Sequence, residues 1–381
     1  SCDDSVVFVE DEQEFILRGA RGYAPTYLKL PKPSPKKLLC LGANQKSTVA
    51  ICVEERVILS PYIGDLDGVK TIEHFRSNIE ILKRVYNFEP EVIICDKHPN
   101  YESTKYALEL KKENPELELI QVQHHYAHIL ATMGVNNIKT KVLGVSFDGT
   151  GYGDDGNLWG GEFMVCDENS YERVGHFKEF KLLGAEKAIK EPRRVALSFL
   201  YEIYGEDTLT LKNSVTDAFS EYELKTLYIS WKKSLNTPLS SSCGRLFDCV
   251  ASLLDIIQII SYEGESALLM ESLYDDRVRE HFEFSIDNGV IDFSKVVVQI
   301  VEESDKQVAL SKFFNTLVEI IYQMSLIYNL AVVVSGGVFQ NRVLIKLLIE
   351  KMPNIILAKG FVTNDSAISY GQAMAFNTLT F

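Results

Sequence analysis

Three of the seven histidines in this 381-residue chain lie within five positions, in the segment 123–128 (QHHYAH). His124 and His128 are four residues apart, so their imidazoles share one face if the segment is helical. Two neutral imidazoles on one face can hold a divalent metal ion. The alternative is a pair of histidines that make only core hydrogen bonds, but the pair follows a buried-looking strand, where α/β sheets place ligands. This position favours a metal site, and the HExxH pattern of metalloproteases is absent.

Two carboxylates elsewhere in the chain are candidates to complete the shell of such a metal. Asp148 ends a predicted strand, KVLGVSFD, and Asp365 stands at the start of the last predicted helix. Carboxylate oxygens are common partners of imidazole in metal sites. A helix N-cap is the better interpretation of Asn364 and an open one for Asp365.

Glycine-rich segments follow three of the predicted strands. They are 42–48 (GANQKST), 148–153 (DGTGYG) and 335–341 (SGGVFQN). Such segments let backbone N–H groups approach phosphate oxygens, and the third opens a helix, which suits a phosphate or a ribose. Ordinary turns explain any one of them alone, but three at equivalent strand ends favour a nucleotide site. Neither GxxxxGK[ST] nor GxGxxG occurs, which excludes a P-loop and a Rossmann fingerprint.

A third signal lies in a long helical segment of the second half. Asp248, in SCGRLFD, could accept hydrogen bonds from ribose hydroxyls, and Gly264, in YEGES, would let a base or sugar lie close. A helical core segment with Asp248 on its solvent face is an equally good interpretation. The pair Arg193 and Arg194 is interpreted as a solvated face or a cap, with a phosphate contact as the alternative.

The expected elements follow one order twice. In the first half, strands at about 36–42, 47–53 and 56–60 precede helix 69–86, strand 91–96, a helix from about 103, strand 117–122 and helix 124–133. In the second half, strands 141–148, 158–166 and 173–180 precede a helical insert at about 186–273, helix 308–328, strand 331–335, helix 340–351, strand 354–357 and helix 366–376. Two copies of β-β-β-α-β-α predict an α/β fold of two duplicated ribonuclease-H-like lobes around a nucleotide cleft.

The chain is predicted to have four parts. Residues 1–23 hold two short strand-like runs, interpreted as the edge of a domain that lies upstream. Residues 24–35 are rich in proline and predict a stiff, extended linker. Residues 36–140 form the first lobe and residues 141–381 the second.

The composition is that of a folded protein, with 46% hydrophobic and 24% charged residues. The net charge of −14 argues against a nucleic-acid partner, because an acidic chain is a poor non-specific binder of phosphate backbones. The best apolar run, 250–260, is interrupted by Asp255 and Gln258, which argues against a membrane span. The seven cysteines are scattered without a CxxC pair, as expected for a reducing, cytoplasmic location.

Together these segments resemble the C-terminal half of the HypF carbamoyltransferases of hydrogenase maturation. The sequence motifs that carry the resemblance are ARGYAP, DKHPNYEST, VQHHYAH, FDGTGYGDDGNLWGGEF, KEPRRVAL, GRLFDCVASLL, YEGESALLME, VSGGVFQNRVL and NDSAISYGQA. The resemblance implies the ASKHA (actin-like ATPase) fold, in the subfamily shared with TsaD and antibiotic O-carbamoyltransferases. It also identifies residues 1–23 as the last strands of a YrdC-like domain. The acylphosphatase-like and zinc-finger regions of full-length members have no counterpart in this sequence, so the resemblance implies only the transfer half of the reaction.

That half-reaction passes the carbamoyl group of carbamoyl-adenylate to the C-terminal cysteine thiolate of HypE, on the way to a cyanide ligand of [NiFe]-hydrogenase. The resemblance implies catalytic roles for His124, His128 and Asp148. It places metal ligands at His124, His128, Asp148 and Asp365, and nucleotide contacts at Gly149, Thr150, Gly151, Asp248, Gly264, Gly336, Gly337 and Asn341. The implied cofactors are ATP or carbamoyl-adenylate and a divalent metal, iron or zinc, with Mg²⁺ as a further candidate. The implied partners are HypE, the upstream YrdC-like domain and an adenine nucleotide.

Three other functions remain as alternatives. A tRNA threonylcarbamoyl transferase has the same fold and a similar metal pair, but the ARGYAP segment and the acidic charge argue against it. An antibiotic O-carbamoyltransferase would accept a sugar hydroxyl in place of a thiol. A non-catalytic scaffold would dock HypE and merely hold ATP.

Overall fold

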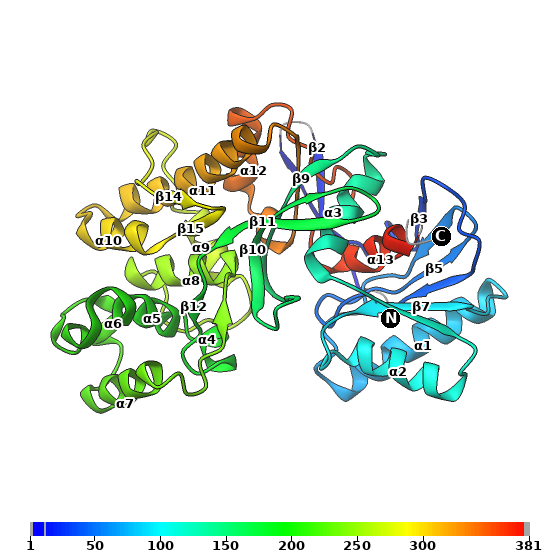
Figure 1. Ribbon diagram of the computed structural model, residues 1–381, viewed down its shortest axis with the longest axis horizontal. Helices are drawn as coiled ribbons and strands as arrows, with labels where there is room; N and C mark the ends of the chain where they lie inside the picture. Colours follow the sequence, from blue (N-terminus) through cyan, green and yellow to red (C-terminus); the bar gives the residue numbers. More distant parts are fainter. Residues whose placement is uncertain (1–2, 11–12, 377–381) are drawn as a thin grey trace.

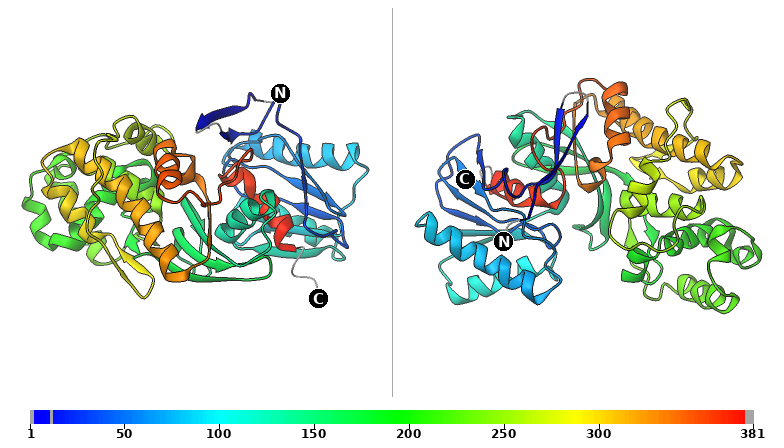
Figure 2. Two further views of the ribbon diagram at one scale, coloured as in Figure 1. Left: turned by 90° about the horizontal axis from the view of Figure 1, so that it is seen from above. Right: turned by 180° about the vertical axis from the view of Figure 1, so that it is seen from behind.

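Two β-sheets, each covered by helices, make up the two lobes of the molecule (Figure 1). The computed structural model describes residues 3–10 and 13–376. The two views in Figure 2 show that the helical insert extends the second lobe away from the first. Mixed α/β lobes of this kind match the predicted fold class.

The first sheet has the strand order β3-β6-β5-β4-β7-β8. Its elements and the helix that follows are β3 (Thr26–Lys29), β4 (Leu38–Cys40), β5 (Ala50–Val53), β6 (Arg56–Leu59), α1 (Val69–Val85), β7 (Val92–Asp96), α2 (Glu102–Glu113), β8 (Glu118–Val122) and α3 (His124–Val135). β4, β5 and β6 form an antiparallel meander, and β7 and β8 are parallel to β4. Parallel neighbours need crossover connections, which α1 and α2 supply.

The second sheet repeats this arrangement around β9. Its main elements are β9 (Val142–Tyr152), β10 (Leu158–Cys166), β11 (Tyr171–Phe177), β16 (Ala331–Ser335), η2 (Gly337–Gln340), α12 (Arg342–Lys351), η3 (Asp365–Ala367) and α13 (Ile368–Phe376). β10 pairs antiparallel with both β9 and β11, and β16 runs parallel to β9. The order β11-β10-β9-β16 therefore corresponds to β6-β5-β4-β7 of the first sheet, which is the predicted duplication.

The insert and the segment after it lie between β11 and β16. They contain β12 (Phe180–Lys181), α4 (Glu186–Lys190), α5 (Pro192–Tyr204), η1 (Gly205–Thr210), α6 (Ser214–Asp217), α7 (Glu221–Lys232), β13 (Leu239–Ser240), α8 (Cys243–Leu253), α9 (Glu265–Glu271), β14 (Ser285–Asp287), β15 (Val290–Asp292), α10 (Ser294–Glu302) and α11 (Lys306–Tyr328). The hairpin β14–β15 extends the second sheet beyond β11. The described helices include none whose length and apolar character would allow it to cross a bilayer.

Helices α3 and α13 cross between the lobes (Figure 1). α3 belongs to the first half of the chain but packs against β9, β10 and β16, whereas α13 belongs to the second half and packs against β4–β7. Small residues set the closeness of this crossing, since a Cβ on Gly371 would lie 1.9 Å from the carbonyl oxygen of Ala127. The crossing brings the end of the chain next to the helix that carries the three clustered histidines. The division at residue 140 stays a prediction, because the helices of the two halves are exchanged across it.

The first strands form a separate hairpin of β1 (Val6–Glu10) and β2 (Gln13–Arg18). The hairpin packs on the second lobe, where the backbone oxygen of Leu17 accepts a hydrogen bond from the side-chain nitrogen of Asn364 at 2.9 Å. Phe15 belongs to the same hydrophobic core as the second sheet. The prediction that this hairpin is the end of a YrdC-like domain stays a prediction.

Several expected boundaries differ from the structure. The segment 148–153 is not a turn, because β9 continues through it as far as Tyr152, paired with β10 across a bulge between Trp159 and Gly161. The expected strand 354–357 is reduced to one bridge, between Val333 and Ile356. The proline-rich linker contributes β3, which pairs with β6 at the sheet edge. β14, β15 and α10 were not expected from the sequence.

Candidate metal and nucleotide site

Helix α3 begins where the histidine cluster begins. The side-chain oxygen of Gln123 accepts a hydrogen bond from the backbone N–H of Tyr126 at 2.8 Å, which caps the helix at its first turn. His124 and His128 are both completely buried. Their rings lie one turn apart on the same face, with centroids 4.9 Å from each other. The expected helical spacing is therefore present.

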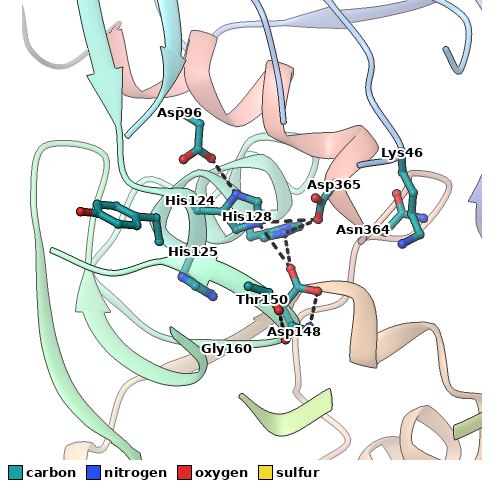
Figure 3. Close-up of polar contacts among 12 residues, drawn as sticks. Lys46, Asp96, His124, His125, His128, Asp148, Thr150, Gly160, Asn364 and Asp365 are labelled. Atoms are coloured by element: carbon teal, nitrogen blue, oxygen red, sulfur yellow. Dashed lines mark hydrogen bonds and ion pairs between the residues drawn. The ribbon is translucent and has the colours of Figure 1, made fainter. Parts of the chain in front are cut away.

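Asp148 and Asp365 face these two rings from the other lobe's sheet and from the start of the last helix (Figure 3). The Nε2 atom of His128 lies 3.0 Å from the Oδ2 atom of Asp148 and 3.4 Å from the Oδ1 atom of Asp365. The Nε2 atom of His124 lies 3.5 Å and 3.6 Å from the same two oxygens. The four ligand atoms lie within 4.8 Å of one another. All four predicted metal ligands therefore converge.

This donor set fits a divalent cation. Ligand atoms about 2.0–2.2 Å from a tetrahedral metal lie roughly 3.3–3.6 Å apart, close to the spacings of these nitrogen and oxygen atoms. The Nε2 atom of His124 is buried without a hydrogen-bond partner, a costly state that an ion between it and the carboxylates would relieve. Two imidazoles and two carboxylates suit iron, zinc or manganese.

Asp96 contacts the opposite side of the His124 ring. Its Oδ2 atom lies 2.7 Å from the Nδ1 atom of His124, and both side chains are completely buried. A proton on Nδ1 would leave the Nε2 lone pair facing the cluster, the arrangement typical of metal-binding histidines. The sequence analysis did not identify Asp96. The available signal was its position as a charged residue at the carboxyl end of the buried strand β7.

The imidazoles and carboxylates of the cluster stabilise one another's charged forms. Burial alone would lower the pKa of His124, but the carboxylates of Asp365 and Asp96 outweigh burial and hold that pKa well above its usual value. Burial also lowers the pKa of His128, and its hydrogen bonds to Asp148 and Asp365 raise it overall. Burial raises the pKa of Asp148, yet the two imidazoles hold it well below the ordinary range. In the absence of an ion the four side chains are therefore held as buried ion pairs, and a cation would replace the imidazole protons.

The third histidine, His125, points away from the carboxylates (Figure 3). Burial and the positive charge of His124 hold its pKa well below the usual value, so the ring is neutral. A Cβ on Gly151 would lie 2.4 Å from the His125 ring. The absence of a side chain at Gly151 thus makes room for this ring.

A pocket with about 570 Å³ of empty space adjoins the cluster in the cleft between the lobes. It is lined by Lys46, Asp148, Gly149, Gly244, Arg245, Phe247, Asp248, Glu263, Gly264, Ala267, Gly337, Val338 and Gln340. A second pocket, which shares seven of these residues, continues toward α12 and is also lined by Asn341. Asp148 belongs to both the cluster and the first pocket.

The predicted nucleotide contacts divide into two groups. Those that line the two pockets are Gly149, Asp248, Gly264, Gly337 and Asn341. Thr150, Gly151 and Gly336 are not among the lining residues, although Thr150 follows Gly149 and Gly336 precedes Gly337. Gly336 has a backbone reason to be glycine, because its φ is +104° and a Cβ would lie 2.2 Å from the carbonyl oxygen of Phe147.

Gly337 and Asp248 have clear local environments. A Cβ on Gly337 would lie 2.9 Å from the Oδ1 atom of Asp148, so this glycine leaves room for the carboxylate of a candidate metal ligand. Asp248 is buried, and its Oδ2 atom lies 2.7 Å from the Nη1 atom of Arg245. The alternative of a solvent-facing Asp248 is therefore wrong. Arg193, at the start of α5 and expected on a solvated face or as a cap, is largely buried and donates hydrogen bonds to Glu191 and to the backbone of Ala218, so the solvated face is wrong for this residue.

Two charged residues of the pocket were missed by the sequence analysis. Lys46 comes from the loop between β4 and β5, and Glu263 from the loop between α8 and α9. Their side chains meet across the cleft, with 3.4 Å between the Nζ and Oε2 atoms. Burial would lower the pKa of Lys46, but Glu263, Asp365 and Asp148 raise it overall. The amine is therefore protonated and positively charged. Both residues lie in glycine-containing segments that the sequence analysis singled out, GANQKST and YEGES. A charged side chain beside the glycines was the signal that could have identified them.

Two duplicated ribonuclease-H-like lobes with a cleft between them define an actin-like, ASKHA-type α/β protein. Comparison with models of known protein families places this chain in one family within that class. Residues 33–134 match the model "HypF Kae1-like domain", and residues 144–372 match "Carbamoyltransferase, Kae1-like Domain, second subdomain". The chain belongs to the HypF carbamoyltransferase family.

Curated relatives agree with this assignment. Carbamoyltransferase HypF of Synechocystis sp. is 35% identical over 98% of this chain and 51% of its own length. The probable carbamoyltransferase HypF of Methanocaldococcus jannaschii is 32% identical over 98% of this chain and 51% of its own length. The chain thus spans about half the length of these relatives.

Solved structures agree as well. A crystal structure of full-length HypF in its phosphate- and nucleotide-bound form superposes with a TM-score of 0.91 at 36% identity, over 99% of this chain and 60% of that one. The crystal structure of HypF from T. kodakarensis superposes with a TM-score of 0.87 at 28% identity, over 98% of this chain and 51% of that one.

Proposed function

We propose that this chain transfers a carbamoyl group from carbamoyl-adenylate to the C-terminal cysteine thiol of HypE, in the maturation of [NiFe]-hydrogenase. The observation that carries the proposal is the double position of Asp148, in the candidate metal cluster and in the wall of the cleft pocket. An adenylate in this pocket would have its reactive end beside the cluster. The names of the relatives and the nucleotide bound to a HypF structure support the same activity.

The reaction exchanges one bond for another. The bond between the carbamoyl carbon and a phosphate oxygen breaks, AMP leaves, and a bond to the acceptor sulfur forms as the thiol proton is lost. A divalent ion held by His124, His128, Asp148 and Asp365 would supply Lewis acidity toward the carbamoyl oxygen. The protein's own part is to bind and orient the adenylate, with Gly149 and Gly337 giving its phosphate close access to the backbone.

The cysteines of this chain support an acceptor thiol from another protein. Every cysteine in the described ranges, 3–10 and 13–376, is buried. Cys243 directly precedes the pocket residue Gly244, and burial together with Asp148 holds its pKa well above the usual thiol value. Such a thiol is a poor nucleophile. The proposal therefore needs HypE as its partner and, as the source of carbamoyl-adenylate, a YrdC-like domain upstream.

The test is single-turnover transfer with synthetic carbamoyl-adenylate and HypE, read by mass spectrometry of the acceptor cysteine. The wild-type chain should carbamoylate HypE, and His124→Ala should slow the transfer by at least about a hundredfold. His74→Ala, an exposed histidine on α1, is the matched control and should keep the wild-type rate.

Two outcomes would contradict the proposal. A wild-type chain that leaves HypE unmodified would remove the transfer activity, and an unchanged rate in His124→Ala would remove the cluster from the mechanism. Parallel reactions with an aminoglycoside and with tRNA as acceptors separate the proposal from the O-carbamoyltransferase and the tRNA-modifying alternatives.

A further inference from the structure

Lys46 is held in the cleft by its backbone. Its φ is +44°, a left-handed conformation that a side-chain-bearing residue rarely adopts. Its backbone N–H donates to the Oδ1 atom of Asp65 at 2.7 Å, and its carbonyl oxygen accepts from the hydroxyl of Ser366 at 2.7 Å. Ser366 follows the candidate metal ligand Asp365. The backbone strain at Lys46 is therefore stabilised from two sides, next to the metal cluster.

The side chain of Lys46 reaches a single carboxylate across the cleft. Its Nζ atom lies 3.4 Å from the Oε2 atom of Glu263, and the two side chains are 31% and 32% exposed. The other oxygen of Glu263 lies over β9, since a Cβ on Gly149 would be only 2.8 Å from the Oε1 atom. The Glu263 carboxylate thus occupies the space above a glycine backbone that is open to a ligand.

Among the charged residues of the first pocket, Lys46 is the cation that is not locked in a buried ion pair. The charged residues that line this pocket are Lys46, Arg245, Asp148, Asp248 and Glu263. Arg245 and Asp248 are both buried and paired with each other. Asp148 is engaged by the cluster imidazoles. The half-exposed pair of Lys46 and Glu263 is therefore the part of the pocket that can rearrange at low cost.

We propose that the carboxylate of Glu263 occupies the place of a nucleotide phosphate in the empty cleft, and that a bound adenylate displaces it and pairs its phosphate with Lys46. The inference rests on the nucleotide-binding part of the proposed function. A carboxylate and a phosphate oxygen offer the same acceptor chemistry to an ammonium group, and both accept contacts beside a glycine backbone. Glu263 then competes with the phosphate, while Lys46 recognises it.

The experiment measures equilibrium binding of AMP, ATP and adenosine by calorimetry, without a carbamoyl donor or HypE. Lys46→Met should weaken AMP and ATP binding by about tenfold or more and leave adenosine within about twofold. Glu263→Gln should strengthen AMP and ATP binding by about threefold to tenfold, again with adenosine unchanged. Lys46→Arg, which keeps the charge, should bind AMP within about threefold of the wild type.

Matched controls come from the same surroundings. Glu265→Gln changes a carboxylate at the first position of α9, two residues after Glu263, that lines neither pocket, and Lys105→Met removes an exposed lysine paired with Glu102. Both should bind all three ligands as the wild type does. Thermal unfolding of each variant separates lost binding from lost folding, and Lys46→Arg keeps the test informative if Lys46→Met unfolds.

Three results would overturn the inference. Equal weakening of adenosine and AMP by Lys46→Met would show that the lysine does not recognise phosphate. Weaker binding of adenosine to Glu263→Gln would place Glu263 on the ribose instead. Absence of saturable AMP and ATP binding in the wild type would remove the site itself. Because HypE is not used, failure of carbamoyl transfer with this binding pattern intact would reject the proposed function and not this inference.

Discussion

The candidate metal cluster and the adjoining pocket share Asp148 but differ in how firmly their side chains are held. In the cluster, both imidazoles are completely buried and each faces two carboxylates. In the pocket, Lys46 and Glu263 remain about one-third exposed and meet in one contact of 3.4 Å. The buried cluster is held in one arrangement from several sides, whereas the partly exposed pair has room to rearrange. The cluster should therefore tolerate change far less than the pocket does.

The largest expected effect comes from removing a cluster ligand. His128→Ala should lower the affinity for zinc or ferrous iron by at least about a hundredfold, because one of four ligands is lost. Metal content after equilibrium dialysis, measured by plasma mass spectrometry, gives the result. AMP binding should change by no more than about threefold. Metal retention at the wild-type level would mean that these side chains are only a buried hydrogen-bond network.

A positioning residue should have a smaller effect. Asp96→Asn keeps the size of the side chain but weakens the hydrogen bond to the Nδ1 atom of His124. Metal affinity should therefore fall by about tenfold to a hundredfold. Asp154→Asn, in a surface pair with Lys97, is the control and should leave metal affinity unchanged. Equal metal affinity in Asp96→Asn and the wild type would make Asp96 a purely structural partner.

The pH dependence follows from the raised pKa values of His124 and His128. Metal binding must displace imidazole protons, so metal affinity should fall by about tenfold for each pH unit below those values for each proton displaced. In metal-free protein the sign is opposite. Stabilisation by the protonated imidazoles is complete below about pH 6.5 and is lost as pH rises through the raised values in the folded state. Stabilisation by Asp148 and Asp365, whose pKa values are lowered, is present above about pH 3.8 and is lost as pH falls through the lowered values of the folded state.

Thermal unfolding in a chelator and in saturating zinc, across pH 5–9, measures both effects. The metal-induced rise in unfolding temperature should grow with pH. A rise that does not depend on pH would show that no imidazole proton is displaced.

The smallest expected effects come from two glycines that differ in what a methyl group would meet. In Gly337→Ala the new Cβ meets the Oδ1 atom of Asp148, which is fixed by the cluster, so metal affinity should fall by about twofold to tenfold. In Gly149→Ala it meets the Oε1 atom of Glu263, which can turn toward solvent, so metal affinity should stay within about twofold. Equal losses in the two variants, measured by competition with a chromophoric chelator, would remove the distinction between rigid cluster and adjustable pocket.

Elements with strong local patterns were predictable from the sequence. The strand 331–335 lies where its run of apolar residues placed it, and the predicted helix 308–328 differs from α11 by two residues. Short elements were not predictable, because β14 and β15 have three residues each and are held by strand pairing, β15 with β11 and β14 with β15. Segment 148–153 was misinterpreted for the same reason: its glycines are typical of a turn, but pairing with β10 keeps the segment in the sheet.

The sequence by itself determined the i, i+4 histidine pair and the repeated order of elements, because both depend on spacing along the chain. Only the tertiary structure decided that Asp365 serves the same cluster, since that depends on how closely Gly371 of α13 approaches α3. It also decided that Asp96 supports His124 and that Lys46 meets Glu263. These contacts join side chains from distant segments, and their direction is set by packing across the lobes, which no local pattern of residues encodes.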